Sequence, residues 1–123
     1  MANELYFKIQ GRYTPANANT TPTSIGIAEK YITQTGVDHQ AGTQSIGTSE
    51  ETLAWSSDIG DEGYLFIRNT DATNFVQIGF STGVYGIRLK AGEFALIRLE
   101  PAATIYIKAD TAAVTVQYIM YED

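Results

Sequence analysis

Residues 63–80 read GYLFIRNTDATNFVQIGF, and this stretch decides the class of fold. Its two ends, residues 64–68 and 75–80, are rich in aromatic and β-branched side chains, which suit a pleated, buried surface. The residues between them, 69–74, are Asn, Thr, Asp and Ala, and such side chains turn a chain by bonding to nearby backbone. Two apolar runs joined by a short polar connection predict an antiparallel β-hairpin.

The arms of this predicted hairpin are apolar on both faces. Successive side chains of a strand alternate, so Tyr64 and Phe66 lie on one side and Leu65 on the other. A hairpin with one face in water would alternate apolar and polar residues, so we expect both faces to be covered. One face is then available to another subunit. The interface candidates are Tyr64, Leu65, Phe66, Phe94, Leu96 and Trp55.

The rest of the chain predicts further short strands. Residues 4–10, 103–109 and 113–121 alternate, and the expected core face of the last segment is Val114, Val116, Tyr118 and Met120. No long segment carries a sustained 3.6-residue apolar period, so helix is minor. We predict an all-β protein with roughly eight to ten short strands. Two packed antiparallel sheets, a β-sandwich with a jelly-roll-like topology, fit so many strands in so short a chain.

The length of 123 residues predicts one domain, residues 1–123. Residues 11–23 are rich in Thr, Asn and Ala and include Pro15 and Pro22, so we expect a flexible loop or arm there. No apolar run approaches the ~20 residues of a spanning helix. The N-terminus also lacks the basic start and apolar middle of a signal peptide. We expect a protein made in the cytoplasm, without a membrane partner.

Charge and residue content exclude several kinds of site. The formal net charge of −6 repels phosphate backbones, and the basic residues are scattered, so we expect no direct nucleic-acid partner. The absence of cysteine excludes disulfides, thiolate metal sites and a cysteine nucleophile. Nothing in the sequence indicates a cofactor.

Catalytic and metal-binding patterns are also missing. His39 is the only histidine, lies in a polar segment that we expect to be a loop, and has no Gly-x-Ser-x-Gly elbow beside it in the sequence. One histidine cannot supply a cupin-like metal site. Asp58, Asp61 and Glu62 share a Gly-containing loop, but their spacing differs from that of a calcium loop, so we interpret this loop as a solvated turn. We predict no enzyme activity, no catalytic residue and no bound metal.

The aromatic residues leave one other function open. Trp55 and the eight tyrosines could form a platform that stacks on sugars, although tyrosines within strands more often pack in a core or an interface. A concave face with two or more exposed aromatic side chains near Trp55 would favour sugar binding. Flat apolar patches on residues 64–68 and 94–99 would favour assembly with other proteins.

Three stretches together resemble small structural proteins of tailed-phage virions. They are GYLFIRNTDATNFVQIG at 63–79, LKAGEFALIRL at 89–99 and YIKADTAAV at 106–114. GTSEE at 47–51 and DIG at 58–60 belong to the same pattern. The resemblance covers about the C-terminal two thirds of the sequence and does not include the first forty residues.

This resemblance implies a non-enzymatic, β-rich protein of the capsid or tail, and decoration (cement) of the head is a frequent role in the family. The expected function is to bridge and stabilise major capsid protein subunits on the outer surface of the virion. Strands apolar on both faces also favour a homo-oligomer, with a trimer ahead of a dimer. The alternatives are a tail or adaptor component of the virion, or a carbohydrate-binding module that recognises a host surface.

Overall fold

The computed structural model describes residues 4–14, 16 and 23–123, with side chains omitted at 23–25. The chain forms two compact units, Met1–Gln34 and Thr35–Asp123, which we call the hairpin unit and the sandwich. The single domain predicted for residues 1–123 stays a prediction, and within it the strands of the hairpin unit pair only with each other. The described residues form ten strands and include no helix long and apolar enough to cross a membrane.

The hairpin unit consists of β1 (Leu5–Tyr13) and β2 (Thr23–Ile32), paired antiparallel with a register shift between Gly11 and Arg12. The predicted arm at 11–23 is partly wrong, since residues 11–13 and 23 belong to these strands. Residues 14 and 16 have no regular strand structure, and residues 15 and 17–22 lie outside the described part of the chain.

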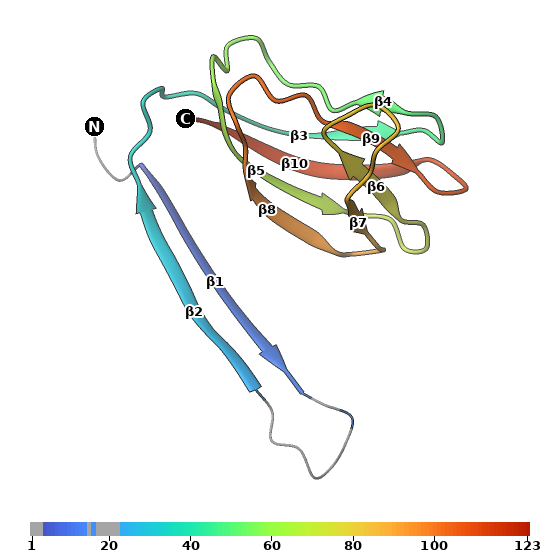
Figure 1. The fold of residues 1–123 in the computed structure, drawn as a ribbon, viewed down its shortest axis with the longest axis horizontal. Coiled ribbons are helices and arrows are strands. Elements are labelled where there is room, and N and C mark those ends of the chain that lie inside the picture. Colours follow the sequence, from blue (N-terminus) through green and yellow to red (C-terminus); the bar gives the residue numbers. More distant parts are fainter. Residues whose placement is uncertain (1–3, 15, 17–22) are drawn as a thin grey trace. The chain divides into compact units, whose positions relative to one another are not determined.

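The sandwich is the predicted jelly roll, with two antiparallel sheets in the orders β3-β10-β5-β8 and β4-β9-β6-β7 (Figure 1). Its pairs are nested: β3 pairs with β10, β4 with β9, β5 with β8 and β6 with β7. Successive pairs alternate between the two sheets. The strands are β3 (His39–Ile46), β4 (Glu51–Thr52), β5 (Glu62–Asn69), β6 (Val76–Gly79), β7 (Ile87–Leu89), β8 (Phe94–Arg98), β9 (Tyr106–Ala109) and β10 (Val114–Glu122).

The hairpin predicted at 63–80 is wrong. Its arms are β5 and β6, which lie in different sheets and pair with other strands. The polar link between them crosses from one sheet to the other, and the fully buried Asn69 holds it in place. Asn69 Nδ2 donates to the Asn74 carbonyl at 2.8 Å and to the Leu89 carbonyl at 3.0 Å, and its Oδ1 accepts from the Asp71 amide at 2.8 Å. These bonds satisfy backbone groups that a hairpin ladder would otherwise have paired.

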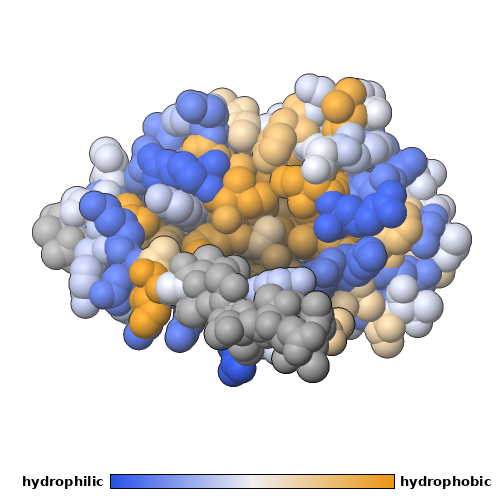
Figure 2. Space-filling model, turned by 60° about the horizontal axis from the view of Figure 1, so that its bottom comes forward, coloured by the Kyte–Doolittle hydropathy of each residue, from blue (hydrophilic) through white to orange (hydrophobic). Residues whose placement is uncertain are grey.

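The core lies between the two sheets and follows the alternation of the sequence. Leu65 and Ile67 of β5 point inward and are fully buried. The predicted core face of β10 is confirmed, because its four residues are all buried in the same cluster. Large apolar side chains also remain exposed, and on the face drawn in Figure 2 hydrophobic residues gather at the centre with hydrophilic residues around them.

Candidate functional site

The outer face of the β3-β10-β5-β8 sheet carries an apolar row that runs across all four strands. The pairing register places Ala41 beside Ile119, Ile119 beside Phe66, and Phe66 beside Leu96. Residues paired in this way point to the same face of an antiparallel sheet. The last three side chains are only partly buried, because the core lies on the opposite face. We call this surface the outer sheet face.

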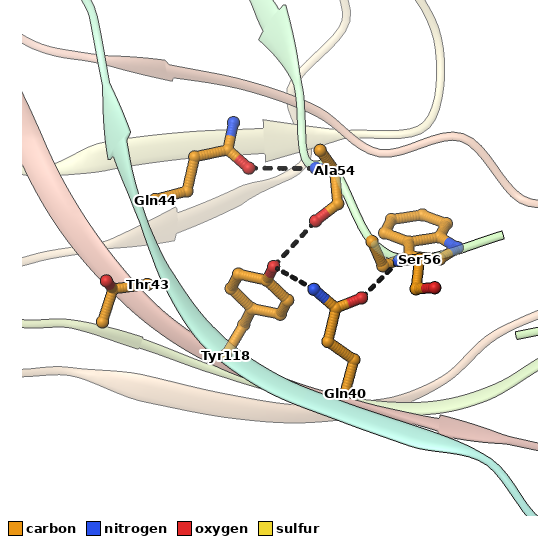
Figure 3. A pocket seen from close by; sticks show the side chains of 7 residues that line it. Gln40, Thr43, Gln44, Ala54, Ser56 and Tyr118 are labelled. Carbon is orange, nitrogen blue, oxygen red and sulfur yellow. Dashed lines mark hydrogen bonds between the residues drawn. The ribbon is translucent and has the colours of Figure 1, made fainter. Parts of the chain in front are cut away.

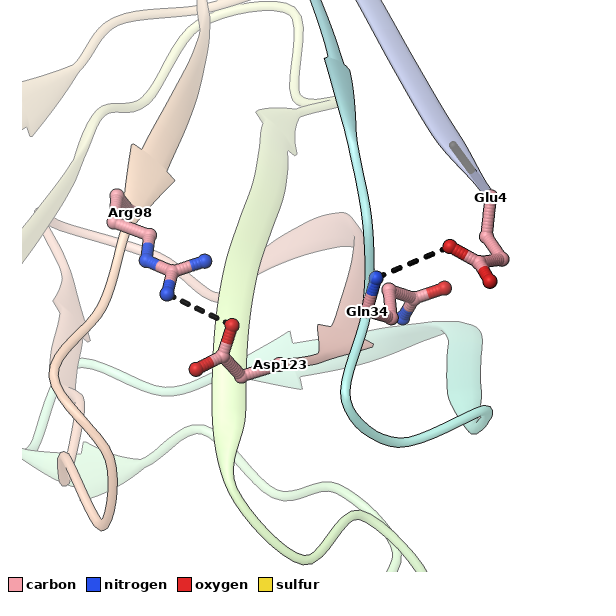
Figure 4. A network of polar contacts seen from close by, with 4 residues as sticks. All are labelled: Glu4, Gln34, Arg98 and Asp123. Atoms are coloured by element: carbon pink, nitrogen blue, oxygen red, sulfur yellow. Dashed lines mark hydrogen bonds and ion pairs between the residues drawn. The ribbon is translucent and has the colours of Figure 1, made fainter. Parts of the chain in front are cut away.

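An aromatic and basic row borders the apolar row on one side. It places His39 beside Tyr121, Tyr121 beside Tyr64, and Tyr64 beside Arg98. The rings of His39 and Tyr121 stack with centroids 6.4 Å apart, and the Arg98 guanidinium lies 5.0 Å from the Tyr64 ring. Arg98 also forms a 2.8 Å salt bridge with Asp123 (Figure 4). The contacts of Arg98 hold its charge at the border of the apolar row.

A mixed row borders the other side, where Phe94 is the most exposed large apolar side chain of the described residues. Its exposed fraction is 67%. Phe94 pairs with Arg68, and its ring lies 6.1 Å from that of Phe66 at a tilted angle. The contact between the two phenylalanines therefore extends the apolar surface from the central row onto the edge strand β8.

Four of the six interface candidates come together on the outer sheet face: Tyr64, Phe66, Phe94 and Leu96. Leu65 does not, since it is fully buried in the core, so its choice as an interface candidate is wrong. Trp55 also lies elsewhere, in the link between β4 and β5, where it packs against the core.

Strands β3 and β10 also contribute residues to this face, and these were not predicted from the sequence. The β10 residues could have been found, because Ile119 and Tyr121 alternate with the four residues predicted to face the core. What could not be found was that β10 lies beside β5. That pairing joins residues far apart in the sequence, which no local pattern encodes.

Trp55 borders an open depression of about 500 Å³ on a different part of the sandwich (Figure 3). The other lining residues are Gln40, Thr43, Gln44, Ala54, Ser56 and Tyr118. The polar groups here bind one another. Gln40 accepts from the Ser56 amide and donates to the Tyr118 hydroxyl at 3.3 Å, and that hydroxyl donates to the Ala54 carbonyl at 2.8 Å.

These hydrogen bonds hold the β4–β5 link against β3 and β10, and we call them the clamp. Gln44 acts in the same way, with its Nε2 bound to Glu51 and to the Thr52 carbonyl and its Oε1 bound to the Ala54 amide. Tyr118 is buried, so Trp55 is the one partly exposed aromatic side chain lining the depression. The pair of exposed aromatic residues that would favour sugar binding is not found among the described lining residues.

The acidic loop at 58–63 is only partly the solvated turn that we predicted. Asp58 and Asp61 are exposed, but Glu62 is buried. Its carboxylate accepts from the Trp55 indole at 3.1 Å and from the Ala102 amide at 2.7 Å. Within the described ranges, no group of three or more His, Cys, Asp or Glu residues is arranged to hold a metal ion.

His39 is the first residue of β3, so its predicted position in a loop is wrong. Its side chain is exposed and its ring stacks on Tyr121. His39 therefore belongs to the aromatic and basic row at the border of the outer sheet face.

Two other carboxylates pin loops of the sandwich. Glu122 accepts from the amides of Asp38, Gly60 and Val37 at 2.9–3.0 Å, and these bonds, those of Asp38 and Gly60 first, lower the pKa of its carboxyl. Glu50 accepts from the Tyr85 hydroxyl and the Gly83 amide, which lower its pKa in turn, while the bond to Glu50 raises the pKa of Tyr85 to about 12. Charged groups already bound in this way stabilise the fold and are poor candidates for catalysis.

Similarity to known proteins does not identify the function of this chain. No protein-family model and no curated protein matches the chain. A solved structure described under "Bacillus endospore appendages form a novel family of disulfide-linked pili" is similar, with a TM-score of 0.48 and 14% sequence identity. The aligned region covers 99% of this chain and 94% of that one. A similarity at this level supports no statement about what the present chain does.

Proposed function

We propose that this chain is a non-enzymatic structural protein that binds other proteins through the outer sheet face. The setting that we propose is the virion of a tailed phage, where the chain decorates the capsid and bridges major capsid protein subunits. The observation that carries the proposal is the apolar row across four strands, with Phe66 at its centre and Phe94 exposed beside it. The phage setting comes from the sequence resemblance.

The composition of the outer sheet face suits protein recognition. Aromatic side chains are enriched at the centres of protein interfaces, and charged side chains are enriched at the rims. Here the apolar row is central, and Arg68 and Arg98 lie on either side of it. Docking removes this apolar area from water, which contributes about 25 cal/mol per Å² before the cost of association. Repeated copies on a symmetric particle add avidity to each contact.

The charge of the sandwich supports an external position on a capsid. Residues 35–123 contain five basic and twelve acidic side chains, a formal net charge of −7. A surface of this sign is repelled by the packaged DNA inside a capsid. The outer surface of the particle carries no such penalty.

The two alternatives make different use of the molecule. A tail or adaptor component would use the same outer sheet face against another virion protein, so the partner separates it from a decoration protein. A carbohydrate-binding module would use the surface at Trp55, where the polar groups already bond to one another. The geometry therefore favours assembly over sugar binding.

The experiment that tests the proposal places a charge on the outer sheet face. Phe94→Lys changes a side chain that is 67% exposed, so the sandwich should keep its fold while losing apolar contact area at the interface. Val84→Lys is the matched control, because Val84 is 64% exposed and belongs to no strand of this sheet. Circular dichroism establishes that both variants fold.

Purified particles of the phage that encodes the chain, stripped of this protein, are then mixed with each variant. We expect Phe94→Lys to lower particle occupancy at least tenfold and to remove the gain in heat stability of the capsid. Val84→Lys should bind as the unmodified chain does. Full occupancy by folded Phe94→Lys would show that the outer sheet face is not the interface. If the unmodified chain binds tails and not heads, the decoration role is wrong and the adaptor role stands.

A further inference from the structure

The hairpin unit has apolar surface that its own two strands cannot cover. A two-stranded hairpin is at best marginally stable in water, and it becomes stable by packing a face on something else. Tyr6, Ile27 and Tyr31 are 44%, 56% and 60% exposed. Because these three side chains come from a single two-stranded sheet, a partner that packs on its surface can bury several of them at once.

These three residues lie on one face of the hairpin. In the β1–β2 register Tyr6 is paired with Tyr31, Lys8 with Glu29, and Gln10 with Ile27, and each pair points to the same side. The opposite side contains the buried Leu5, the partly buried Phe7 and Ile32, and, before the register shift, a single exposed large apolar side chain, Ile9, at 53%. We call the first side the tyrosine face.

The tyrosine face is preorganised. The rings of Tyr6 and Tyr31 lie 4.6 Å apart, and the Tyr6 hydroxyl donates to Glu29 Oε2 at 2.6 Å. At the open end of the hairpin the Gln34 amide donates to Glu4 at 3.1 Å and ties the strand ends together (Figure 4). Side chains fixed in this way lose little conformational entropy when a partner covers them.

Charge indicates which partner suits this face. Residues 1–34 contain three basic and two acidic side chains, a formal net charge of +1, whereas the sandwich carries −7. Two sandwiches therefore repel each other, while two hairpins meet at little electrostatic cost. On the tyrosine face itself Lys8 and Glu29 are paired and cancel. A second copy of the same hairpin matches this near-neutral aromatic surface, and like faces pack in closed symmetric oligomers.

We propose that the chain self-associates through its hairpin units, with the tyrosine face of one copy packed against the tyrosine face of another. This places self-association on the hairpin unit and leaves the outer sheet face of each sandwich for the virion partner. The inference concerns copies of this chain alone, so it does not depend on capsid binding.

The test uses the full chain in analytical ultracentrifugation at ~10–100 μM protein. The unmodified chain should sediment as an oligomer, and the double variant Ile27→Lys/Tyr31→Lys as a monomer. Phe94→Lys, the same kind of change at an exposed apolar residue of the sandwich, should remain oligomeric. A monomeric unmodified chain, an oligomeric double variant or a monomeric Phe94→Lys overturns the proposal. The outcome for capsid binding is read separately: Phe94→Lys should lose particle binding and keep self-association.

A second measurement avoids dependence on a disrupted hairpin. The chain has no cysteine, so a single engineered thiol is unique. Ile27→Cys treated with a short bismaleimide should give a covalent dimer, and Phe94→Cys at the same concentration should remain monomeric on denaturing gels. Equal cross-linking of the two variants, or none with Ile27→Cys, contradicts self-association through the tyrosine face.

Discussion

Asn69→Asp tests whether Asn69 holds the link that crosses between the two sheets, because it changes one group in the core and preserves the shape of the side chain. In the native chain the Nδ2 group donates to two carbonyls, those of Asn74 and Leu89. Aspartate places an oxygen there, which faces both carbonyl oxygens at about the same distances. The Asp71 amide can still donate to the other side-chain oxygen. The substitution therefore removes two donated bonds and introduces a charge at a position with no exposed surface.

The size of the effect depends on pH. A protonated carboxyl can donate to one of the two carbonyls, so at low pH the loss is one hydrogen bond and one unpaired carbonyl, about 1–2 kcal/mol. An ionised carboxylate that is buried without a partner costs about 3–5 kcal/mol. Burial and the two carbonyls raise the pKa of the new carboxyl above its unfolded value near 3.9. The penalty then grows by about 1.4 kcal/mol per pH unit above that value until the folded form also ionises.

The assay is urea unfolding at several pH values from 4 to 7.5, followed by the fluorescence of Trp55, the only tryptophan. The comparison is the difference in free energy of unfolding between variant and unmodified chain at each pH, so that the titration of other carboxylates cancels. Gln117→Glu is the matched control, since it makes the same amide-to-acid change at an exposed position of β10. We expect the control to lie within 0.5 kcal/mol at every pH.

Two results would refute the reasoning. A penalty below about 1 kcal/mol at pH 7 would mean that Asn69 does not hold the crossing between the sheets. A large penalty with no dependence on pH would mean that the carboxyl stays charged or solvated in the folded protein.

Three other substitutions test the packing of the sandwich. Gly79→Ala should destabilise the fold by about 1–3 kcal/mol, because an added Cβ would lie 1.8 Å from the Val84 carbonyl oxygen. Thermal unfolding measures the loss, and the control is Gly86→Ala, whose added Cβ meets nothing within 4 Å. Glu122→Gln should make stability fall less steeply on acidification. In the native chain the lowered pKa of Glu122 stabilises the fold above the ordinary value of 4.5, and this gain is lost as pH falls through the folded pKa. An unchanged acid-unfolding profile would show that the bonds of Glu122 do not stabilise the loops. Tyr118→Phe should cost about 1 kcal/mol in urea unfolding, and no loss would mean that the clamp contributes little.

The strands and the direction in which their side chains point could be predicted from the sequence, because both depend on local alternation. Four of the interface candidates share a face for this reason. Leu65 was misplaced although the alternation already required it to oppose Tyr64. Trp55 lies outside the outer sheet face, in a link without a period, and its place in an interface stays a prediction.

The pairing of the strands could not be predicted in the same way. The polar residues after β5 resemble a turn, since Asn69 and Asp71 favour local bonds in a hairpin as well as in a crossing between sheets. The bond from Asn69 to the Leu89 carbonyl of β7 favours the crossing over the hairpin, and Leu89 is distant in sequence. The position of β10 beside β5 could not be predicted for the same reason, because the two strands are distant in sequence.

The nested order of the strand pairs also determines when the sandwich can form during synthesis. β3 pairs only with β10. Ile46 therefore cannot pair until Val114 has been synthesised, and His39 cannot pair until Tyr121 has been synthesised. At translation rates of about 5–20 residues per second, the interval between those two segments is several seconds or more. The β1–β2 hairpin needs no later segment, and hairpins form in about 1–10 μs. The strands of the hairpin can therefore pair seconds before the sandwich is complete, and a partner that packs on the tyrosine face can stabilise that pairing early.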